Sequence, residues 1–386
     1  MRRGDGRAET ADIESDVGVD AESVSRSRRR GIMTEYVVLE KKCGVAVLTI
    51  QRPEKLNALS LEVIEGIMTA LEECRRDDSV RLVLFEGAGE RAFCAGGDVK
   101  SVYELGRSGN PEAAETVFRR EFEMDFVIAD FPKVILSYLD GITMGGGVGM
   151  SISTDFRVVT ERTKWAMPEM KIGLFPDVGT SYYLSKLPNG MGHYVCLTSK
   201  TIDADDCLYL GVADYKIRSS DYASLKADIL RSFGKILTAG EVAETLKNLL
   251  RKYACGRKKG YLEMHEALIS KYFDKDSLDD VTESLRTAAS RGEDSEFIAQ
   301  VMSEFDGNSP TSMAVVMEQH RRARDGMTVR ECLDQDYVLV RNFLRNHDFY
   351  EGVRTLLVEK SGTPMWNPKH HRDVDVLSYF RSAQSK

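Results

Sequence analysis

The sequence predicts an α/β fold, in which a covered and mainly parallel β-sheet in the first half of the chain is followed by a helical C-terminal region. In the first half, strand-like segments alternate with segments that have an apolar residue every three or four positions. After about residue 221 the strand signals fade and helical patterns dominate. Apolar residues make up 42% of the 386 residues, which excludes a globally disordered or fibrous chain.

Residues 1–32 differ in composition from all that follows. They hold seven arginines and seven acidic residues, no aromatic residue, and no apolar periodicity. Such a segment cannot bury enough apolar surface to offset its ordering entropy, so we expect a disordered extension. It lacks the apolar stretch of a secretory signal, and its acidic residues fit a mitochondrial transit peptide poorly. The folded chain is predicted to start at Met33, with a core over 33–220 and the helical region over 221–386.

The core elements follow from local patterns. Residues 37–40 and 45–51 read as strands joined at Cys43 and Gly44, and 61–76 as an amphipathic helix. The apolar run 80–86 predicts a buried strand that enters a glycine-containing loop at 87–98. The later predicted elements are a helix at 112–129 and strands at 134–139, 156–159 and near 164–166. Strands separated by helices indicate crossover connections and therefore parallel pairing.

Capping signals mark two helices of the C-terminal region. Ser309 followed by Pro310 is typical of a helix start, with a capping residue and proline in the first turn. Thr328 with Glu331 has the spacing of a capping box, which opens a helix predicted to run to about Asn346.

Charge, cysteine and histidine usage exclude several classes of function. The net charge is −8, without a large basic block in the folded part, which disfavours a nucleic-acid partner. The seven cysteines are scattered and never spaced as C-x-x-C, and the six histidines form no H-E-x-x-H motif, so we expect no metal site. The longest stretch without a charged residue is 141–154, too short to span a bilayer. These features favour a cytoplasmic protein, or a mitochondrial matrix protein if the source is eukaryotic.

Two glycine-containing loops carry the first chemical signal. The segments 92–98 (AFCAGGD) and 145–149 (GGGVG) each follow an apolar strand. Glycine lets the backbone approach a ligand closely, and one free N–H from each loop would form an oxyanion hole. Tight turns and close helix packing would explain the same glycines. Neither loop has the G-x-G-x-x-G pattern of a dinucleotide site.

Together the loops resemble the crotonase, or enoyl-CoA hydratase/isomerase, superfamily. The pattern is present in order: Arg52-Pro53 with Asn57-Ala58, then FCAGGD, then GITMGGGVG. This resemblance implies a crotonase-like core of repeated ββα units with an acyl-CoA bound between sheet and helices. It also implies that the backbone amides of Gly97 and Gly146 bind the thioester carbonyl.

Two further motifs resemble a hydrolase family within that superfamily, the 3-hydroxyisobutyryl-CoA hydrolases. One is AMPExxIGLFPDVG over 166–179, which holds Glu169 and Asp177; the other is HDFYEGVR over 347–354, followed by PMWNP over 364–368. The resemblance spans roughly 34–368. It implies hydrolysis of the thioester of 3-hydroxyisobutyryl-CoA, an intermediate of valine breakdown, without any cofactor beyond the CoA of the substrate.

The acidic residues separate this reading from that of a hydratase. In the family that the chain resembles, the hydratases add water with two glutamates. One of these matches Glu169, and the other falls where this chain has Gly149. We expect Glu169 to act on the carbonyl as nucleophile or as base for water, and Asp177 to orient water or bind the substrate hydroxyl. Glu121, on the apolar stripe of the helix at 112–129, is implied to contact substrate; a structural ion pair is the alternative.

Two other functions stay open on the sequence alone. One is an enoyl-CoA hydratase or isomerase, and the other is a non-catalytic acyl-CoA-binding protein. We expect no membrane partner, and oligomerisation is compatible with the sequence. Asp98, Cys94 and His347 are interpreted as structural residues: a loop brace, a buried filler and a packed or capping side chain.

Overall fold

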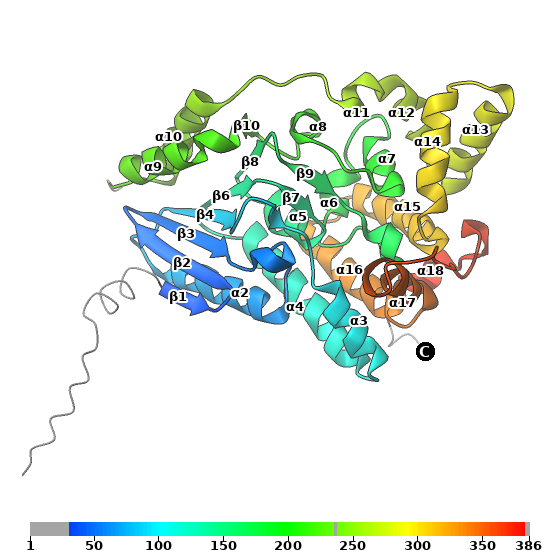
Figure 1. Ribbon diagram of the computed structural model, residues 1–386, viewed down its shortest axis with the longest axis horizontal. Helices are drawn as coiled ribbons and strands as arrows, with labels where there is room; N and C mark the ends of the chain where they lie inside the picture. The colour runs from blue at the N-terminus through cyan, green and yellow to red at the C-terminus, as the bar shows by residue number, and fades with distance from the viewer. Residues whose placement is uncertain (1–30, 235–237, 383–386) are drawn as a thin grey trace, which may run out of the picture.

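The computed structural model describes residues 31–234 and 238–382 (Figure 1). The predicted disordered extension lies outside the described residues except for its last two. Gly31 and Ile32 begin strand β1 (Gly31–Thr34), which pairs antiparallel with the next strand, so regular structure starts two residues before the predicted boundary.

A seven-stranded sheet forms the frame of the core. Its strand order is β1-β2-β3-β4-β6-β8-β10, antiparallel from β1 to β3 and parallel from β3 onward. After β1 the strands are β2 (Val37–Lys42), β3 (Val45–Ile50), β4 (Leu82–Gly87), β6 (Val134–Leu139), β8 (Phe156–Thr160) and β10 (Tyr215–Ile217). The predicted parallel sheet is therefore confirmed, with an antiparallel edge formed by the N-terminal strands.

Alternating side chains of this sheet are buried on its two faces. Val45 and Val47 face one helical layer, and their neighbours Ala46 and Leu48 face the other, because strand side chains alternate. The first layer is α9 (Tyr222–Ser232) with α10 (Ala239–Tyr253), and the second includes α2 (Leu61–Arg76) and α4 (Pro111–Ala129) (Figure 1). Both faces are covered, as the apolar runs of the central strands predicted.

A second, three-stranded sheet was not predicted. Its order is β5-β7-β9, all parallel, with β5 at Ala92–Cys94, β7 at Ile142–Met144 and β9 at Lys164–Ala166. Only the last of these strands was expected from the sequence. A three-residue strand contains too few positions to show a period of two, so β5 and β7 were indistinguishable from loop.

The chain is helical after β10 throughout the described residues, which confirms the predicted C-terminal region. Its larger helices after α10 are α12 (Glu266–Phe273), α13 (Leu278–Arg291), α14 (Ser295–Asp306), α15 (Pro310–Arg324), α16 (Val329–Phe343) and α17 (His347–Val353). Ser309 caps α15, and Thr328 with Glu331 forms the predicted capping box of α16, which ends three residues before Asn346. Helix α16 packs on α4, so the helical region joins the core directly (Figure 1).

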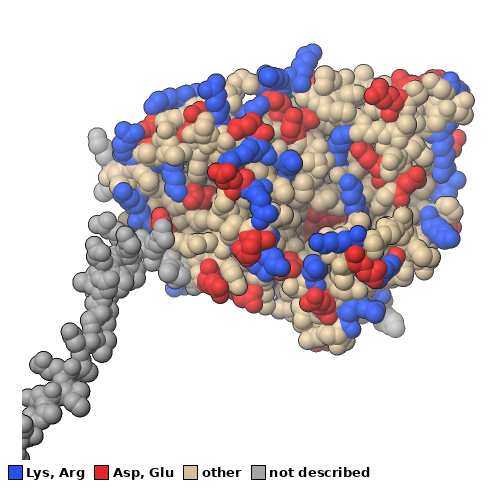
Figure 2. Space-filling model, viewed as in Figure 1, with Lys and Arg blue, Asp and Glu red and all other residues tan. Residues whose placement is uncertain are grey.

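The surface charges are mixed. On the face drawn in Figure 2, basic and acidic side chains alternate and no broad stripe of either sign is present. Within the two described ranges, no helix has both the length and the apolar character needed to cross a bilayer.

Candidate active site

The second sheet brings the predicted site segments to one edge. Strand β5 leads into the first glycine loop, β7 into Gly145, and β9 into the segment that carries Glu169. The three strands are parallel neighbours, so the segments that follow their carboxyl ends emerge side by side. This arrangement assembles the candidate site from segments far apart in the sequence.

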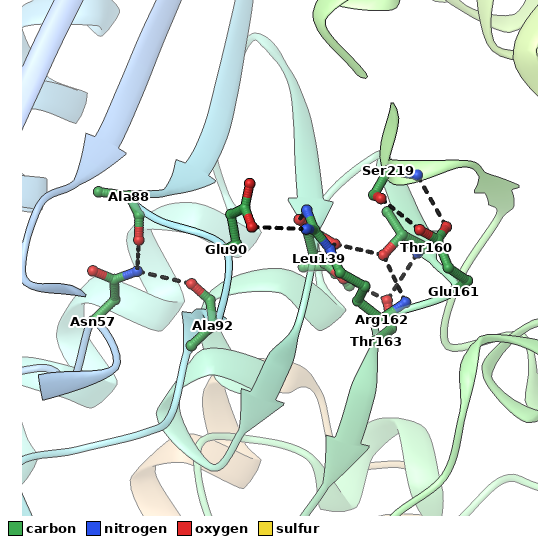
Figure 3. Close-up of polar contacts among 11 residues, drawn as sticks. Asn57, Ala88, Glu90, Ala92, Leu139, Thr160, Glu161, Arg162, Thr163 and Ser219 are labelled. Atoms are coloured by element: carbon green, nitrogen blue, oxygen red, sulfur yellow. Dashed lines mark hydrogen bonds and ion pairs between the residues drawn. The ribbon is translucent and has the colours of Figure 1, made fainter. Parts of the chain in front are cut away.

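The first glycine loop is held by side-chain and backbone hydrogen bonds. Asn57, fully buried, donates its Nδ2 to Ala88 O at 3.0 Å and to Ala92 O at 2.8 Å, and so closes the segment before β5 (Figure 3). Leu59 donates its N–H to Gly96 O at 2.9 Å and accepts from Asp98 N at 2.8 Å. Gly97 lies between these bonds, and within the described residues its own N–H has no acceptor.

The second glycine loop meets the first. Gly145 precedes helix α5 (Gly146–Ile152), and a Cβ on Gly96 would lie 3.5 Å from the nitrogen of Gly146. The Gly146 N–H, in the first turn of α5, also lacks an acceptor in the described part of the chain. Two unused backbone donors, from Gly97 and Gly146, therefore occur on loops in mutual contact, and their role as an oxyanion hole stays a prediction.

The turn that leads into β9 is held by the hydrogen bonds of Thr163. Thr163 donates its hydroxyl to Leu139 O at 2.6 Å and accepts from Thr160 N at 2.8 Å (Figure 3). These bonds anchor the turn between β8 and β9 to the end of β6. They thereby set where the chain emerges toward Glu169.

Glu121, on helix α4, lies beside both Gly97 and Gly146. Its Oε1 occupies the space next to Gly146, where a Cβ would lie 2.0 Å away, and its Oε2 is 3.4 Å from the Cβ position of Gly97. The side chain is 3% exposed and forms no ion pair among the described residues. Burial, with a smaller effect of the charge of Asp177, raises the pKa of Glu121 to about 8. Within the described residues the structural ion-pair alternative therefore finds no partner, and the carboxyl lies next to the two glycines predicted to form the oxyanion hole.

Glu169 begins a short 3-10 helix, η2 (Glu169–Ile172), directly after β9. Its Oε1 lies 2.7 Å from where a Cβ of Gly145 would be, while its Oε2 is buried without a hydrogen-bond partner. Burial and the nearby charge of Asp177 raise the pKa of Glu169 well above its usual range. The carboxyl is thus buried next to the second glycine loop, and within the described residues its Oε2 is left to interact with a bound group.

The C-terminal motif packs on the turn that carries Glu169. Gly352 of α17 lies so close to this turn that a Cβ there would be 2.4 Å from the carbonyl carbon of Ile172. Ser309 donates its N–H to Met170 O at 3.0 Å and its hydroxyl to Asp348 Oδ2 at 2.6 Å. The two distant motifs that together resemble the hydrolase family are therefore one packing unit in the fold.

Asp177 sits in a strained turn beyond η2. Its neighbour Val178 has φ +52°, a conformation that costs about 1–3 kcal/mol in a β-branched residue. Asp177 is 4% exposed, and burial raises its pKa above the ordinary value. Glu169 and Asp177 thus form an electrostatically coupled acid pair next to the glycine loops.

Gly149 has no room for a side chain. A Cβ at this position would lie 2.6 Å from the Cβ of Val178 and 3.0 Å from Asp125 Oδ2. The turn that presents Asp177 therefore fills the space beside the position where the family pattern predicts the second hydratase glutamate.

Sequence reasoning missed three buried polar residues around this turn: Asp125, Gln319 and Asp336. Asp125 lies one helical turn after Glu121 on α4, is 3% exposed, and both its oxygens lack a hydrogen-bond partner. Burial, then the charges of Glu121, Asp177 and Asp336, raise its pKa well above the usual range. The available signal was an acid at i+4 from Glu121 on the same apolar stripe.

Replacing Asp125 with asparagine should make stability less dependent on pH. Asp125 is neutral in the fold at pH values where it would ionise in the unfolded chain, so its contribution is intact below about pH 4 and is lost as pH rises through its folded pKa. We expect the variant to unfold like the parent near pH 4, and to be more stable than the parent near pH 8.

Thermal unfolding from pH 4 to 9 measures this difference, with Asp130→Asn, at the exposed residue that follows the end of the same helix, as matched control. A constant gap between the two variants across that range would show that Asp125 does not titrate as its burial requires.

Two of the three residues interpreted as structural behave so. Asp98 caps α3 (Val99–Arg107) and pairs with Arg52 at 3.0 Å, which braces the first loop. Cys94 is fully buried, which raises the pKa of its thiol to about 12 and leaves it unreactive. His347 is instead exposed in the first turn of α17, with its Nδ1 3.2 Å from Asp348, so the interpretation of a packed or capping side chain was wrong.

The site offers acids and backbone donors. Across residues 31–234 and 238–382, no group of three or more His, Cys, Asp or Glu side chains has the arrangement to hold a metal ion. Its residues can bind an oxyanion through two amides and can hold or transfer protons through buried carboxyls.

Known sequences show what the chain is similar to. Residues 45–380 match the enoyl-CoA hydratase/isomerase family model. The 3-hydroxyisobutyryl-CoA hydrolase, mitochondrial, of Rattus norvegicus is 36% identical over 92% of this chain and 90% of its own length. The protein of the same name from Homo sapiens is 34% identical over 91% and 90%. The resemblance seen in the two hydrolase motifs is thereby confirmed.

Solved structures agree on the fold. A carnitinyl-CoA dehydratase from Mycobacterium thermoresistibile superposes with a TM-score of 0.81 at 31% identity, covering 92% of this chain and 98% of that one. An enoyl-CoA hydratase from Rhodobacter sphaeroides 2.4.1 gives 0.80 at 28% identity, covering 90% and 98%. The predicted crotonase-like architecture is confirmed, and the chain belongs to the enoyl-CoA hydratase/isomerase family.

Proposed function

We propose that this protein hydrolyses the thioester of 3-hydroxyisobutyryl-CoA to 3-hydroxyisobutyrate and CoA. One observation supports it above the others: the buried acids Glu169 and Asp177 stand beside two contacting loops with unused backbone donors at Gly97 and Gly146. The names of relatives alignable over about nine-tenths of the chain point to the same reaction.

The chemistry follows from these positions. The amides of Gly97 and Gly146 hold the thioester oxygen and stabilise its negative charge as the carbonyl carbon becomes tetrahedral. Water supplies the oxygen that ends in the acid product, the carbon–sulfur bond breaks, and the CoA sulfur leaves with a proton. Because burial raises the pKa of both carboxyls and the charge of Asp177 raises that of Glu169 further, one can be protonated while the other is ionised, which provides an acid and a base together.

Two roles of Glu169 fit this arrangement. As nucleophile it would form a transient anhydride with the acyl group, and as base it would deprotonate the attacking water. Single-turnover hydrolysis in heavy-oxygen water tests the anhydride, because attack of water on its glutamyl carbonyl leaves label in the carboxyl of Glu169. Label in Glu169 would establish the nucleophile, and label confined to the product is what the base route requires.

A hydratase is the second candidate, supported by the named activities of the two solved structures. It would need a second acid near Gly149, where Val178 leaves no space for a side chain. Asp125 lies beside that position, so it is the residue on which hydration would depend in this chain.

A panel of acyl-CoAs tests the function. We expect thiol release from 3-hydroxyisobutyryl-CoA, and at a lower rate from 3-hydroxypropionyl-CoA, with Glu169→Gln and Asp177→Asn as controls whose activity is strongly reduced but measurable. Loss of crotonyl-CoA absorbance without thiol release would favour the hydratase. Thermal stabilisation by these thioesters with no turnover of any of them would favour an acyl-CoA-binding protein.

The pH profile provides an independent prediction. Because burial and mutual charge raise the pKa of Glu169, kcat/KM should fall on acidification well above pH 4.5, the region where an exposed glutamate titrates. In Asp177→Asn the negative neighbour is gone, so the acid limb of the residual activity should move to lower pH. If the acid limb of the kcat/KM profile stayed at the same pH in Asp177→Asn, the charge of Asp177 would not influence the titration of Glu169 in catalysis.

The cellular compartment that we propose is inferred from the names of the relatives. The two named hydrolases are mitochondrial proteins, so we place the reaction in the mitochondrial matrix if the source is eukaryotic, and in the cytoplasm otherwise.

A further inference from the structure

The turn that carries Asp177 is tied to the C-terminal helices on both sides of that residue. On the side before it, Pro176 O accepts a hydrogen bond from Gln319 Nε2 on α15 at 3.0 Å. On the side after it, Gly179 donates its N–H to Asp336 Oδ2 on α16 at 2.8 Å. The two anchors flank Asp177 and the left-handed Val178.

The two anchoring side chains are also bonded to each other. Gln319 Nε2 donates to Asp336 Oδ1 at 2.8 Å, and both residues are fully buried. The amide nitrogen of Gln319 therefore faces two oxygens, which fixes the orientation of the amide, since only its nitrogen can donate. Each carboxylate oxygen of Asp336 is occupied by one donor. The result is a closed chain of hydrogen bonds from Pro176 through both side chains to Gly179.

This polar chain is unusual for its surroundings. The side chains around it are those of the main hydrophobic core, such as Leu333 and Leu339 on α16, and a buried polar group there is costly unless it is paired. The backbone it holds is left-handed at Val178, which is unfavourable for a β-branched residue, and again at Gly179 (φ +71°), where glycine adopts it readily. A strained backbone conformation persists only where its surroundings hold it in place, and here the buried side chains of Gln319 and Asp336 do so.

We propose that Gln319 and Asp336 are positioning residues, which set the Asp177 carboxyl against Glu169 and so give the C-terminal helical region a part in the reaction. This inference rests on the proposed hydrolysis. Neither residue touches the glycine loops; each acts through the backbone next to Asp177. Loss of either anchor should let the turn relax, which misplaces Asp177 while the amides and Glu169 keep their positions.

The decisive experiment is a double-mutant cycle between Gln319→Met and Asp177→Asn on the full chain, measured by thiol release from 3-hydroxyisobutyryl-CoA. Methionine keeps the volume of the side chain and removes its donor. We expect Gln319→Met alone to lower kcat by about 10²-fold, because a misplacement of about 1 Å has that effect, with KM changed by less than about threefold. In the Asp177→Asn background the same substitution should lower kcat by less than about twofold.

Controls keep the outcomes distinct. Asn342→Leu removes a side-chain amide on α16, one that bonds Tyr379 O at 2.7 Å instead of the Asp177 turn, and should leave kcat within about twofold. Asp336→Asn can keep only one of its two bonds, so it should fall between the parent and Gln319→Met; it also serves if Gln319→Met does not fold, as judged by thermal unfolding.

Equal losses from Gln319→Met with and without Asp177 would overturn the proposal and leave a purely structural role. So would a loss confined to KM. An inactive parent protein would instead overturn the proposed hydrolysis. The cycle would then have no kcat to compare, and the positioning role, which rests on that hydrolysis, would be overturned with it.

Discussion

Glu169→Gln should lower the turnover of 3-hydroxyisobutyryl-CoA by about 10³-fold or more, since it removes the group assigned to attack or to proton transfer. Glutamine has nearly the same shape, so the packing of η2 against α17 should persist. The carboxyl is also buried with a raised pKa, so its neutral replacement should not destabilise the fold. Thiol release measures turnover, and calorimetric titration with a non-cleavable acyl-CoA measures binding.

The expected pattern is a large loss of kcat with binding within about threefold, because Glu169 is asked to act in the transition state more than in the ground state. Glu123→Gln, on the outer face of α4, is the matched control and should keep full activity. An active Glu169→Gln enzyme would show that the thioester is attacked by a group elsewhere.

Gly146→Ala should be nearly as damaging, for a steric reason. Its Cβ would lie 2.0 Å from Glu121 Oε1 and 2.9 Å from Leu59 Cδ1, so either the carboxyl or the first turn of α5 must move. Losing one oxyanion donor lowers kcat by about 10²–10³-fold in enzymes that use such a hole. We expect a loss of this size, measured by the same thiol assay.

Gly240→Ala provides the comparison, because a Cβ at Gly240 on α10 meets nothing within 4 Å. That variant should be fully active and equal to the parent or more stable, as alanine favours a helix over glycine. If Gly146→Ala kept normal turnover, the first turn of α5 would not be the oxyanion site.

Much of the fold was predictable because the longer helices and strands show a recognisable period of apolar residues in the sequence. The helix expected at 61–76 is α2 with the same ends, and the strand expected at 134–139 is β6. The capping residues Ser309 and Thr328 located two helix starts. The strands β5 and β7 were missed, because three residues carry no recognisable alternation and their pairing is with segments distant in the sequence.

The site was predictable where motif residues bear the chemistry, and not where tertiary packing supplies it. Resemblance led to Gly97, Gly146, Glu121, Glu169 and Asp177, and the structure brings them together, while their roles stay predictions. No local sequence pattern distinguishes Gln319 or Asp336 from the many other polar residues on helices. Their importance follows only from their hydrogen bonds to the backbone of Pro176 and Gly179. The C-terminal motif was visible as a pattern, but its packing against Glu169 was not.

A crystal structure with an acyl-CoA analogue in which a methylene group replaces the thioester sulfur would test the oxyanion assignment most directly. The analogue keeps the carbonyl and cannot be cleaved. We expect its oxygen at about 3 Å from the nitrogens of both Gly97 and Gly146, with the Glu169 carboxyl against the carbonyl carbon or a water beside it. A carbonyl bound away from these two amides, or turned from Glu169, would contradict the mechanism.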